Sequence, residues 1–390
     1  MIESNNARWI TLALLFVARI GLGFQFQTLG SISTNLVADL NLDYTEIGTL
    51  IGLFMVPGMF LAIPAGLSGR FASDRFIIGM GLLTLAVGGA CAAIASSFEL
   101  LALGRFISGV GFVFSSIFFT KMVADWFAGK NLALAMSVLV SSWPIGIAIG
   151  QIGQGWIAEN YDWQSAFWVV SLYCFFSACI ILFLCKDAPG IAKASGGFRF
   201  TLSRAEVALT TLAALIWALF NAAYVLYLSF APIVLEVNGY DTLTALGTIS
   251  IASWMMIFTI SMFGYLSDQS GKPDVIIYFC MGVAVISLAL LIYTPFGLSS
   301  TLLFGFAGIA PAGVIMSLTG VAMRPENRAI GMGLFFTIYF VLQALAPPIG
   351  GWLFDLTESA NWPIVFAMGL FACTALATYL FQVTARRHVL

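Results

Sequence analysis

Apolar runs of the length needed to cross a bilayer, about 20 residues, recur along the whole chain and are separated by polar turns. We count twelve such runs in the 390 residues. They cover residues 9–37, 45–69, 76–97, 100–126, 132–157, 164–185, 205–235, 243–267, 275–295, 300–323, 329–354 and 363–384. Open strands cannot face hydrocarbon, because their backbone groups would lack hydrogen-bond partners. The sequence therefore predicts an all-α integral membrane protein with twelve transmembrane helices.

The charged residues are too few to cover a soluble protein of this size. Asp, Glu, Lys and Arg make up 9% of the chain and hydrophobic residues 61%, whereas soluble proteins carry about 25% charged residues. The first run is too long for the core of a signal peptide, so we expect it to be the first span. The 6 cysteines lie in or beside the runs without disulfide or metal-ligand spacing, and we expect them to be packing residues.

Basic residues predict the orientation of the spans. With the N-terminus in the cytoplasm, all but two of the 16 Lys and Arg residues fall on the inner side, and the two exceptions, Arg19 and Arg105, lie within spans. Such an excess of basic residues is typical of cytoplasmic loops. We therefore expect a protein embedded in the lipid bilayer with both termini cytoplasmic, and the short loops without an N-x-S/T sequon fit a bacterial inner (plasma) membrane. The net charge of -2 gives no reason to expect a nucleic-acid partner.

Similar segments recur at an offset of about half the chain. "TEIGTLIGLF" from Thr45 resembles "TALGTISIAS" from Thr244, and "GLSGRFASDR" from Gly66 corresponds to "GYLSDQSGKP" from Gly264. Such repetition indicates the parallel repeat of large secondary transporters. We expect two pseudo-symmetric six-helix bundles, 1–185 and 205–390, joined by a polar cytoplasmic linker, 186–204.

The second of these loops carries a family signature. It fits the pattern Gly-x-Leu-x-Asp-x-x-Gly-Lys/Arg of the major facilitator superfamily through Gly264, Leu266, Asp268, Gly271 and Lys272. The first-half copy is degraded, with Asp74 and Arg75 retained and Arg70 where the pattern has an acid. "GRFISGVG" in the fourth span fits a second motif of the family, and "FVAR" with "PAGLSGRF" looks similar to its cyanate, nitroimidazole and nitrate branches. The resemblance covers the whole chain and implies the family's fold, alternating access, and a gating role for these loop residues.

Two arginines bring charge into the predicted spans. Arg19 stands about 16 Å along a helix from Arg8, near mid-membrane, and shares a face with Gln27. Arg105 lies in the fourth span, and no Asp or Glu lies deep in any predicted span. A charge inside a membrane is usually functional or paired. We expect Arg19, Gln27 and Arg105 to bind a small anionic substrate, either carboxylate-like or inorganic.

An alternative is that backbone carbonyls, Gln27 and water hold both arginines as structural residues. The chain would then carry or export a neutral or drug-like solute. In the second half, the candidate lining residues are Asn221, Tyr224, Trp254, Tyr339 and Gln343. Pockets combine apolar walls with a few polar groups, but each of these side chains could equally serve in packing.

Other classes of protein fit less well. A membrane enzyme needs acids, bases or metal ligands clustered at depth, and an ATP-driven pump needs a phosphate-binding loop. The sequence contains neither pattern, so we expect no catalytic residue, metal or cofactor. A receptor or sensor built on a transporter scaffold is the alternative of another class, and a flux assay separates the two. We expect a monomeric secondary or facilitative transporter, with its coupling ion open.

Overall fold

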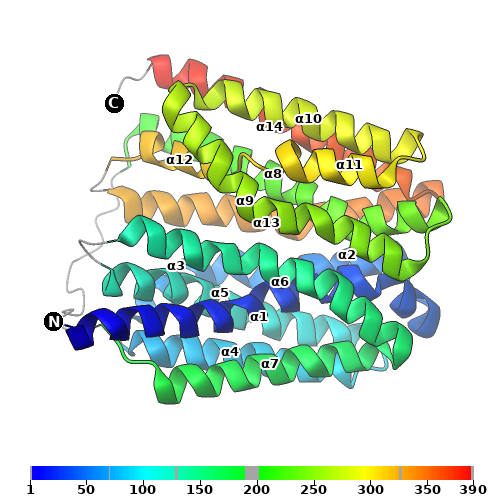
Figure 1. Ribbon diagram of the computed structural model, residues 1–390, viewed down its shortest axis with the longest axis horizontal. Coiled ribbons are helices and arrows are strands. Elements are labelled where there is room, and N and C mark those ends of the chain that lie inside the picture. Colours follow the sequence, from blue (N-terminus) through cyan, green and yellow to red (C-terminus); the bar gives the residue numbers. More distant parts are fainter. Residues whose placement is uncertain (1, 70, 128–130, 189–201, 325–326, 388–390) are drawn as a thin grey trace. The chain divides into compact units, whose positions relative to one another are not determined.

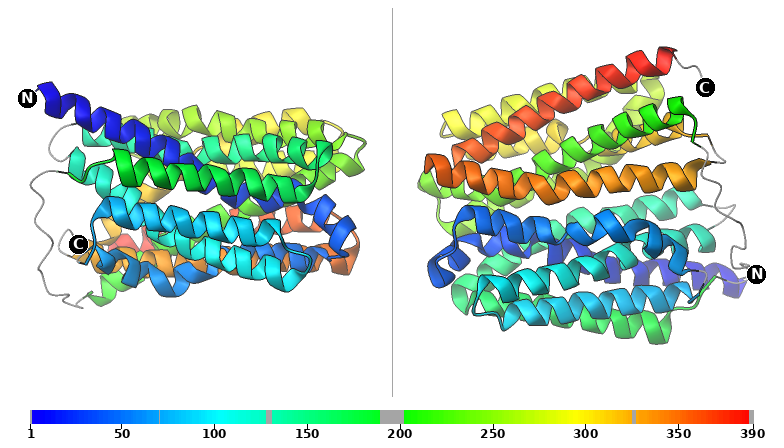
Figure 2. Two further views of the ribbon diagram at one scale, coloured as in Figure 1. Left: turned by 90° about the horizontal axis from the view of Figure 1, so that it is seen from below. Right: turned by 180° about the vertical axis from the view of Figure 1, so that it is seen from behind.

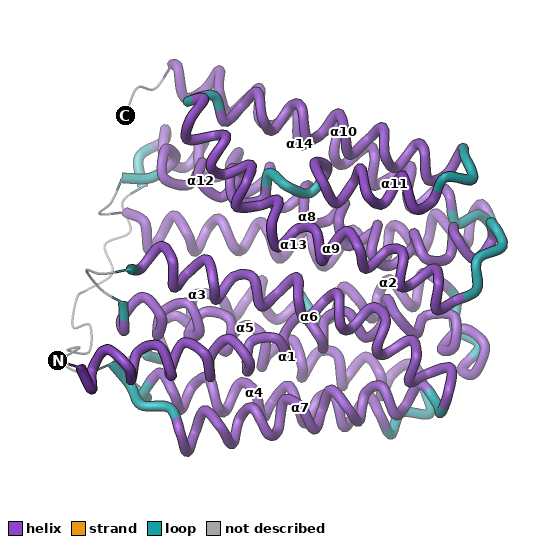
Figure 3. The backbone as a smooth tube through the Cα atoms, in the orientation of Figure 1, coloured by secondary structure: helices purple, strands orange, loops and turns teal. Residues whose placement is uncertain are grey.

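The computed structural model describes all residues except 1, 70, 128–130, 189–201, 325–326 and 388–390, and the regular secondary structure of the described residues is entirely helical (Figures 1 and 3). Within those residues, 12 helical segments are long and apolar enough to cross a membrane. Each overlaps one of the predicted runs. The prediction of an all-α membrane protein with twelve spans is therefore confirmed, as expected for chains whose backbone groups must be satisfied within each segment.

The chain divides into two compact units. The first contains Met1–Leu40 and Val56–Gly197, and the second contains Asn41–Met55 and Phe198–Leu390. A short early segment thus packs with the second unit before the chain returns to the first. The predicted bundle boundaries, 1–185 and 205–390, stay a prediction, because most of the predicted linker lies outside the described residues.

The first unit is built on helices that approach one another at glycines. Its helices are α1 (Ile2–Leu40), α3 (Val56–Ser68), α4 (Asp74–Ala93), α5 (Phe98–Trp126), α6 (Leu132–Asn160) and α7 (Trp163–Leu184). α4 packs on α5 and α7, and α1 packs on α6 (the same helices are seen from two more sides in Figure 2). A Cβ on Gly88 would lie 2.6 Å from the carbonyl oxygen of Gly104. The backbones of α4 and α5 are therefore in direct contact, which only glycine permits there.

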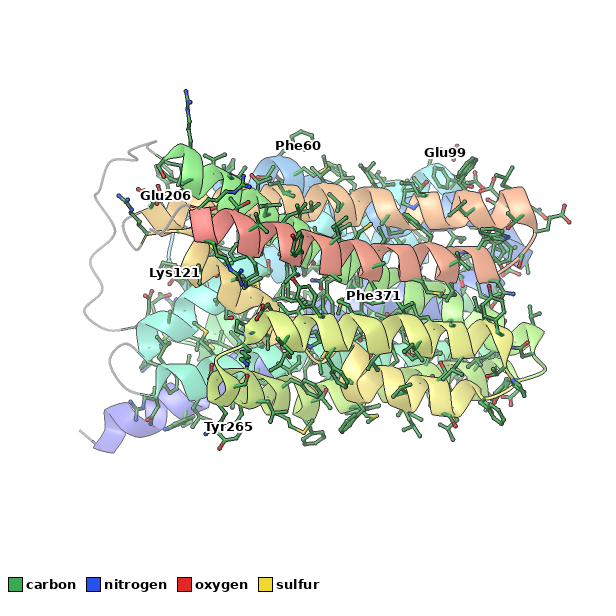
Figure 4. The ribbon with its side chains drawn as sticks, turned by 90° about the horizontal axis from the view of Figure 1, so that it is seen from above. Phe60, Glu99, Lys121, Glu206, Tyr265 and Phe371 are labelled. Carbon is green, nitrogen blue, oxygen red and sulfur yellow. The ribbon has the colours of Figure 1, made fainter. Side chains whose placement is uncertain are left out.

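The second unit surrounds α8. Its elements are α2 (Tyr44–Leu53), α8 (Arg204–Val237), α9 (Thr242–Ser270), α10 (Pro273–Tyr293), α11 (Gly297–Leu303), the π-helical turn η1 (Phe304–Gly308), α12 (Ala312–Ala322), α13 (Arg328–Thr357) and α14 (Asn361–Arg387). α8 packs on α13 and α14, and α2 packs on α13. Phe371 of α14, labelled in Figure 4, is fully buried, with its ring 6.0 Å from that of Phe220 and 5.8 Å from that of Phe304.

Prolines interrupt two of the spans. α2 ends at Leu53 and α3 begins at Val56, directly before Pro57. α11 continues into η1, which ends at Gly308. α12 begins at Ala312, directly after Pro311. A proline ring clashes with the carbonyl four residues earlier and has no N–H to donate. The break at Phe54–Met55 is also where the chain leaves the second unit.

Charged residues lie toward both ends of α5. Glu99 lies in the first turn and Lys121 near the last, and Figure 4 shows them toward opposite ends of the helix. Asp125 lies in the last turn and pairs with Lys121 (2.8 Å), so an acid accompanies the basic residue at that end.

Candidate functional site

Arg19 lies partway along α1, and its guanidinium reaches α6. Nη1 donates to the carbonyl of Leu139 (2.8 Å) and to Ser142 Oγ (3.0 Å), with the Val140 carbonyl at 3.5 Å. Pro144 has no N–H, so the Val140 carbonyl, the most distant of the three oxygens, loses its partner in the helix. Arg19 therefore supplies a donor beside the carbonyl that Pro144 leaves without its helical partner, in a region where water cannot do so freely.

These contacts do not neutralise the charge of Arg19. Among the residues that the structure describes, no Asp or Glu forms an ion pair with it. Its Nε is buried and has no hydrogen-bond partner. A guanidinium stays charged at any working pH, and a buried charge without an opposite charge is unfavourable. Arg19 thus keeps an unused donor and an uncompensated charge.

Gln27 lies on the same side of α1 as Arg19. Its side chain is 2% exposed and its Nε2 has no hydrogen-bond partner. It packs against α6, because a Cβ on Gly150 would lie 3.1 Å from the Cβ of Gln27. Between the two polar residues the helices touch, since a Cβ on Gly23 would lie 2.5 Å from the Trp143 carbonyl oxygen. We call this contact, from Arg19 to Gln27 on α1 and from Leu139 to Gly150 on α6, the α1–α6 seam.

Arg105 belongs to a different contact within the first unit. Its side chain is fully buried, and Nη1 donates to the carbonyl of Gln25 in α1 (3.0 Å). Gln25 Nε2 in turn donates to Ser108 Oγ of α5 (2.9 Å). These bonds join α1 to α5 through Gln25, whereas the guanidinium of Arg19 bonds to α6. The structure therefore does not bring Arg105 into contact with Arg19.

Three of the predicted residues of the second unit gather around Trp217 of α8. Asn221 Nδ2 donates to the Trp217 carbonyl (2.8 Å), and the Tyr339 ring of α13 lies 6.4 Å from the Trp217 ring. Gln343, also on α13 and 1% exposed, has its Nε2 3.5 Å from the carbonyl of Ala218. The group joins α8 to α13. Tyr224 makes a separate contact, in which its hydroxyl lies 2.7 Å from Ser253 Oγ of α9.

Trp254 is in none of these contacts, whereas its neighbour Ser253 forms the hydrogen bond to Tyr224 of α8. Trp254 remains 41% exposed. The sequence pattern did not indicate Ser253, Trp217 or Trp143. Trp217 precedes Asn221 by one helical turn, a spacing that could have revealed it. Single residues in an apolar span, such as Ser253 and Trp143, give no periodic signal.

The degraded loop of the first half forms ion pairs within its own unit. Lys121 Nζ lies 2.6 Å from Asp74 Oδ2 and 2.8 Å from Asp125 Oδ2. Arg75 Nε lies 3.5 Å from Asp187 Oδ2, and the Arg75 amide donates to Asp187 Oδ1 (3.0 Å). These pairs tie the start of α4 to α5 and to the segment after α7. Arg70 lies outside the described residues.

The signature loop of the second half ends α9 and begins α10. Gly271 adopts a positive φ of 61°, a conformation that favours glycine and terminates the helix. Gly264, about two turns earlier, has open space beside it. Asp268 and Lys272 are both exposed and take part in no ion pair among the described residues. Together with α12 and α14, the loop lines a cavity of about 580 Å³.

Groups of His, Cys, Asp and Glu that could hold a metal ion are absent from the described part of the chain.

The sequence comparison is decisive for the family. The profile of the Major Facilitator Superfamily matches residues 15–347. The chain belongs to this superfamily. Its matched relatives and structural neighbours are transporters, so the predicted family, fold and non-enzymatic character are confirmed.

Full-length relatives differ in what they carry. The chain is 25% identical to a gallate transporter of Pseudomonas putida, covering 93% of this chain and 88% of the relative. It is 22% identical to a multidrug efflux protein of Bacillus subtilis (strain 168), covering 90% and 87%. An uncharacterized transporter of Buchnera aphidicola subsp. Schizaphis graminum (strain Sg) is 29% identical but is matched over only 35% of each chain.

Solved structures support the fold. A bacterial homolog of the human lysosomal transporter Spinster, in an inward-facing and unoccupied conformation, superimposes with a TM-score of 0.78. The two chains are 15% identical, and the match covers 97% of each. This likeness concerns the arrangement of the helices and not the substrate.

Proposed function

We propose that this protein moves a small anionic solute, carboxylate-like or inorganic, across the membrane by alternating access. The observation that carries the proposal is Arg19, a permanently charged group within a span, with no carboxylate partner among the described residues and a buried Nε that donates to nothing. A bound oxyanion would supply both the missing charge and the missing acceptor. The gallate transporter among the relatives carries a solute of this class by name.

The geometry of the guanidinium suits this role. Nη1 is engaged by oxygens of α6, which fixes the orientation of the plane. The opposite edge, formed by Nε and Nη2, is the one that a carboxylate can engage through two parallel hydrogen bonds. Gln27 Nε2 is a second buried donor without a partner on the same side of α1. It is a candidate to contact the charged group of the anion or the remainder of the solute.

The second candidate is transport of a neutral or drug-like solute, with both arginines structural. Two observations favour it. Arg105 is fully buried and bonded to the backbone of α1, and Arg19 already donates to α6 where Pro144 interrupts the helix. The multidrug efflux protein among the relatives is named for such solutes.

A binding screen separates the two candidates. Purified protein is heated with acetate, benzoate, phosphate or neutral benzamide, because a ligand that binds the native state raises the melting temperature in proportion to RT ln(1 + [L]/Kd). We expect stabilisation by a carboxylate or phosphate and its loss in monodisperse Arg19→Gln. The control Arg8→Gln removes an arginine from the start of the same helix and should leave the shift unchanged. Stabilisation by benzamide alone, retained in Arg19→Gln, would favour the neutral solute.

We also propose a bacterial inner-membrane location with both termini and the linker in the cytoplasm, on the basis of the distribution of Lys and Arg. In a cysteine-free background, a cysteine introduced at Ser195 should react with a membrane-impermeant maleimide only after the cells are opened. Labelling of intact cells would reverse the orientation.

A further inference from the structure

An aromatic cluster lies beside Arg19 and Gln27 in the first unit. Trp143 of α6 packs against Phe26 of α1 (ring centroids 5.4 Å apart) and Phe112 of α5 (5.7 Å). Phe26 and Phe112 are 5% and 7% exposed, whereas Trp143 is partly exposed. The indole is therefore the accessible part of the cluster, and the two phenyl rings support it from neighbouring helices.

Trp143 lies on the face of α6 that also meets the two donors. Leu139, which accepts from Arg19, precedes it by one turn, and Gly150, which meets Gln27, follows two turns later. Residues at these spacings share a helix face. Trp143 stands about 6 Å along the axis from Leu139. An aromatic surface thus lies one turn from the guanidinium, on the same seam.

We infer that the substrate of this protein is a carboxylate attached to a flat aromatic ring, with its carboxylate at Arg19 and its ring against Trp143. The inference rests on the proposed anion transport and adds the chemical class of the part of the solute that is attached to the carboxylate. A charged group beside an aromatic surface suits an amphipathic anion of about the size of benzoate. Aromatic pairs prefer offset-stacked or edge-to-face geometry and gain more than their buried area alone provides.

Benzoate and cyclohexanecarboxylate make a matched pair of probes. They share the carboxylate and the ring size, but only benzoate is flat and aromatic. A merely apolar wall favours the saturated ring, which is the more hydrophobic of the two. We therefore measure the Kd of each for purified wild-type protein, Trp143→Leu and Arg19→Gln. Trp156→Leu is the control, because Trp156 lies on the same helix but pairs with Tyr161, with ring centroids 6.1 Å apart.

The expected result is a benzoate preference of about three- to tenfold in the wild type, as aromatic contacts of this kind provide. Trp143→Leu should abolish the preference while retaining binding of cyclohexanecarboxylate, and Trp156→Leu should keep the preference. Arg19→Gln should lose both ligands. If Trp143→Leu is not monodisperse, Phe112→Leu replaces it with the same expectation of a reduced preference.

Equal or weaker binding of benzoate by the wild type, or an undiminished preference in Trp143→Leu, would overturn the aromatic assignment and leave the anion proposal standing. Binding of both probes that survives Arg19→Gln would instead overturn the anion site. Absence of wild-type binding of either carboxylate would overturn the carboxylate assignment and the aromatic one with it.

Discussion

Asp355 holds α2 within the second unit, and its removal should free that helix. Its carboxylate accepts from the amide of Tyr44 (3.0 Å), the amide of Thr45 (2.7 Å) and the hydroxyl of Thr45 (2.6 Å). The first amides of a helix have no acceptor within it, and the helix dipole favours an anion there. Asp355, which comes from α13, thus satisfies the start of a helix that is distant in sequence. Asp43 caps the same helix from its own N-terminus through the amide of Glu46 (2.7 Å), so Asp355 is the carboxylate that ties these first amides to α13.

The magnitude follows from these bonds. Hydrogen bonds to a charged group contribute about 1.5–3 kcal/mol each when their loss leaves a buried group unsatisfied. Asp355 is only partly buried, so water can replace some of them, and loss of a helix cap typically costs about 0.5–2 kcal/mol. We expect Asp355→Ala to reduce the local stability of α2 by about 2 kcal/mol. This corresponds to a roughly thirtyfold larger equilibrium constant for local opening, and hence to roughly thirtyfold faster hydrogen exchange.

Hydrogen exchange followed by mass spectrometry on peptides covering Tyr44–Leu53 measures this change. The control is Asp162→Ala, because Asp162 caps α7 of the first unit through the Ser165 amide (2.6 Å). It should accelerate exchange at the start of α7 and leave α2 unchanged. If exchange of the α2 peptides in Asp355→Ala stays within about threefold of the wild type, the assigned role of this carboxylate is wrong.

Three further predictions concern packing, a thiol and the signature loop. Gly23→Ala should destabilise the protein by about 1–3 kcal/mol, because its Cβ would lie 2.5 Å from the Trp143 carbonyl oxygen, whereas Gly66→Ala enters open space and should be nearly neutral in the same denaturation assay. Burial, with a smaller contribution from the charge of Asp187, raises the pKa of the Cys185 thiol to about 11. About one thiol in a thousand is then ionised at pH 8, and maleimide labelling of Cys185 should be slow until the protein is denatured in detergent; full labelling of native protein within minutes would contradict this. Asp268→Asn should slow liposome uptake of benzoate while changing its Kd less than about threefold, and loss of binding by a folded variant would place Asp268 in the substrate site instead.

Length and hydrophobicity were enough to predict the spans. A run such as 76–97 can satisfy its backbone in hydrocarbon only as a helix, and the structure has α4 at Asp74–Ala93. The end of α9 at Ser270, three residues beyond the predicted run, could also have been found from local chemistry, because Gly271 adopts the left-handed conformation that terminates a helix. These features depend on residues that are close in sequence.

The contacts of the candidate site depend on residues that are distant in sequence. The lack of an embedded acid indicated that Arg19 had no counter-ion, but nothing in the sequence indicated that its Nη1 would reach Leu139 of α6. Trp143 was missed for the same reason, because its partners come from α1 and α5. The docking of α2 on α13 through Asp355 likewise joins segments near opposite ends of the chain. Tertiary packing decides all three, and the pattern of apolar residues leaves it open.

Uptake of radiolabelled benzoate into liposomes tests the role of Arg19 most directly. Wild-type protein should give saturable uptake. Arg19→Lys keeps the charge but loses the planar pair of donors, so it should be at least about tenfold slower, a loss typical of a charge-assisted hydrogen bond. Arg19→Gln, monodisperse after purification, should give only the background of empty liposomes. Uptake by Arg19→Gln at close to the wild-type rate would contradict the assignment of Arg19 as the anion-binding residue.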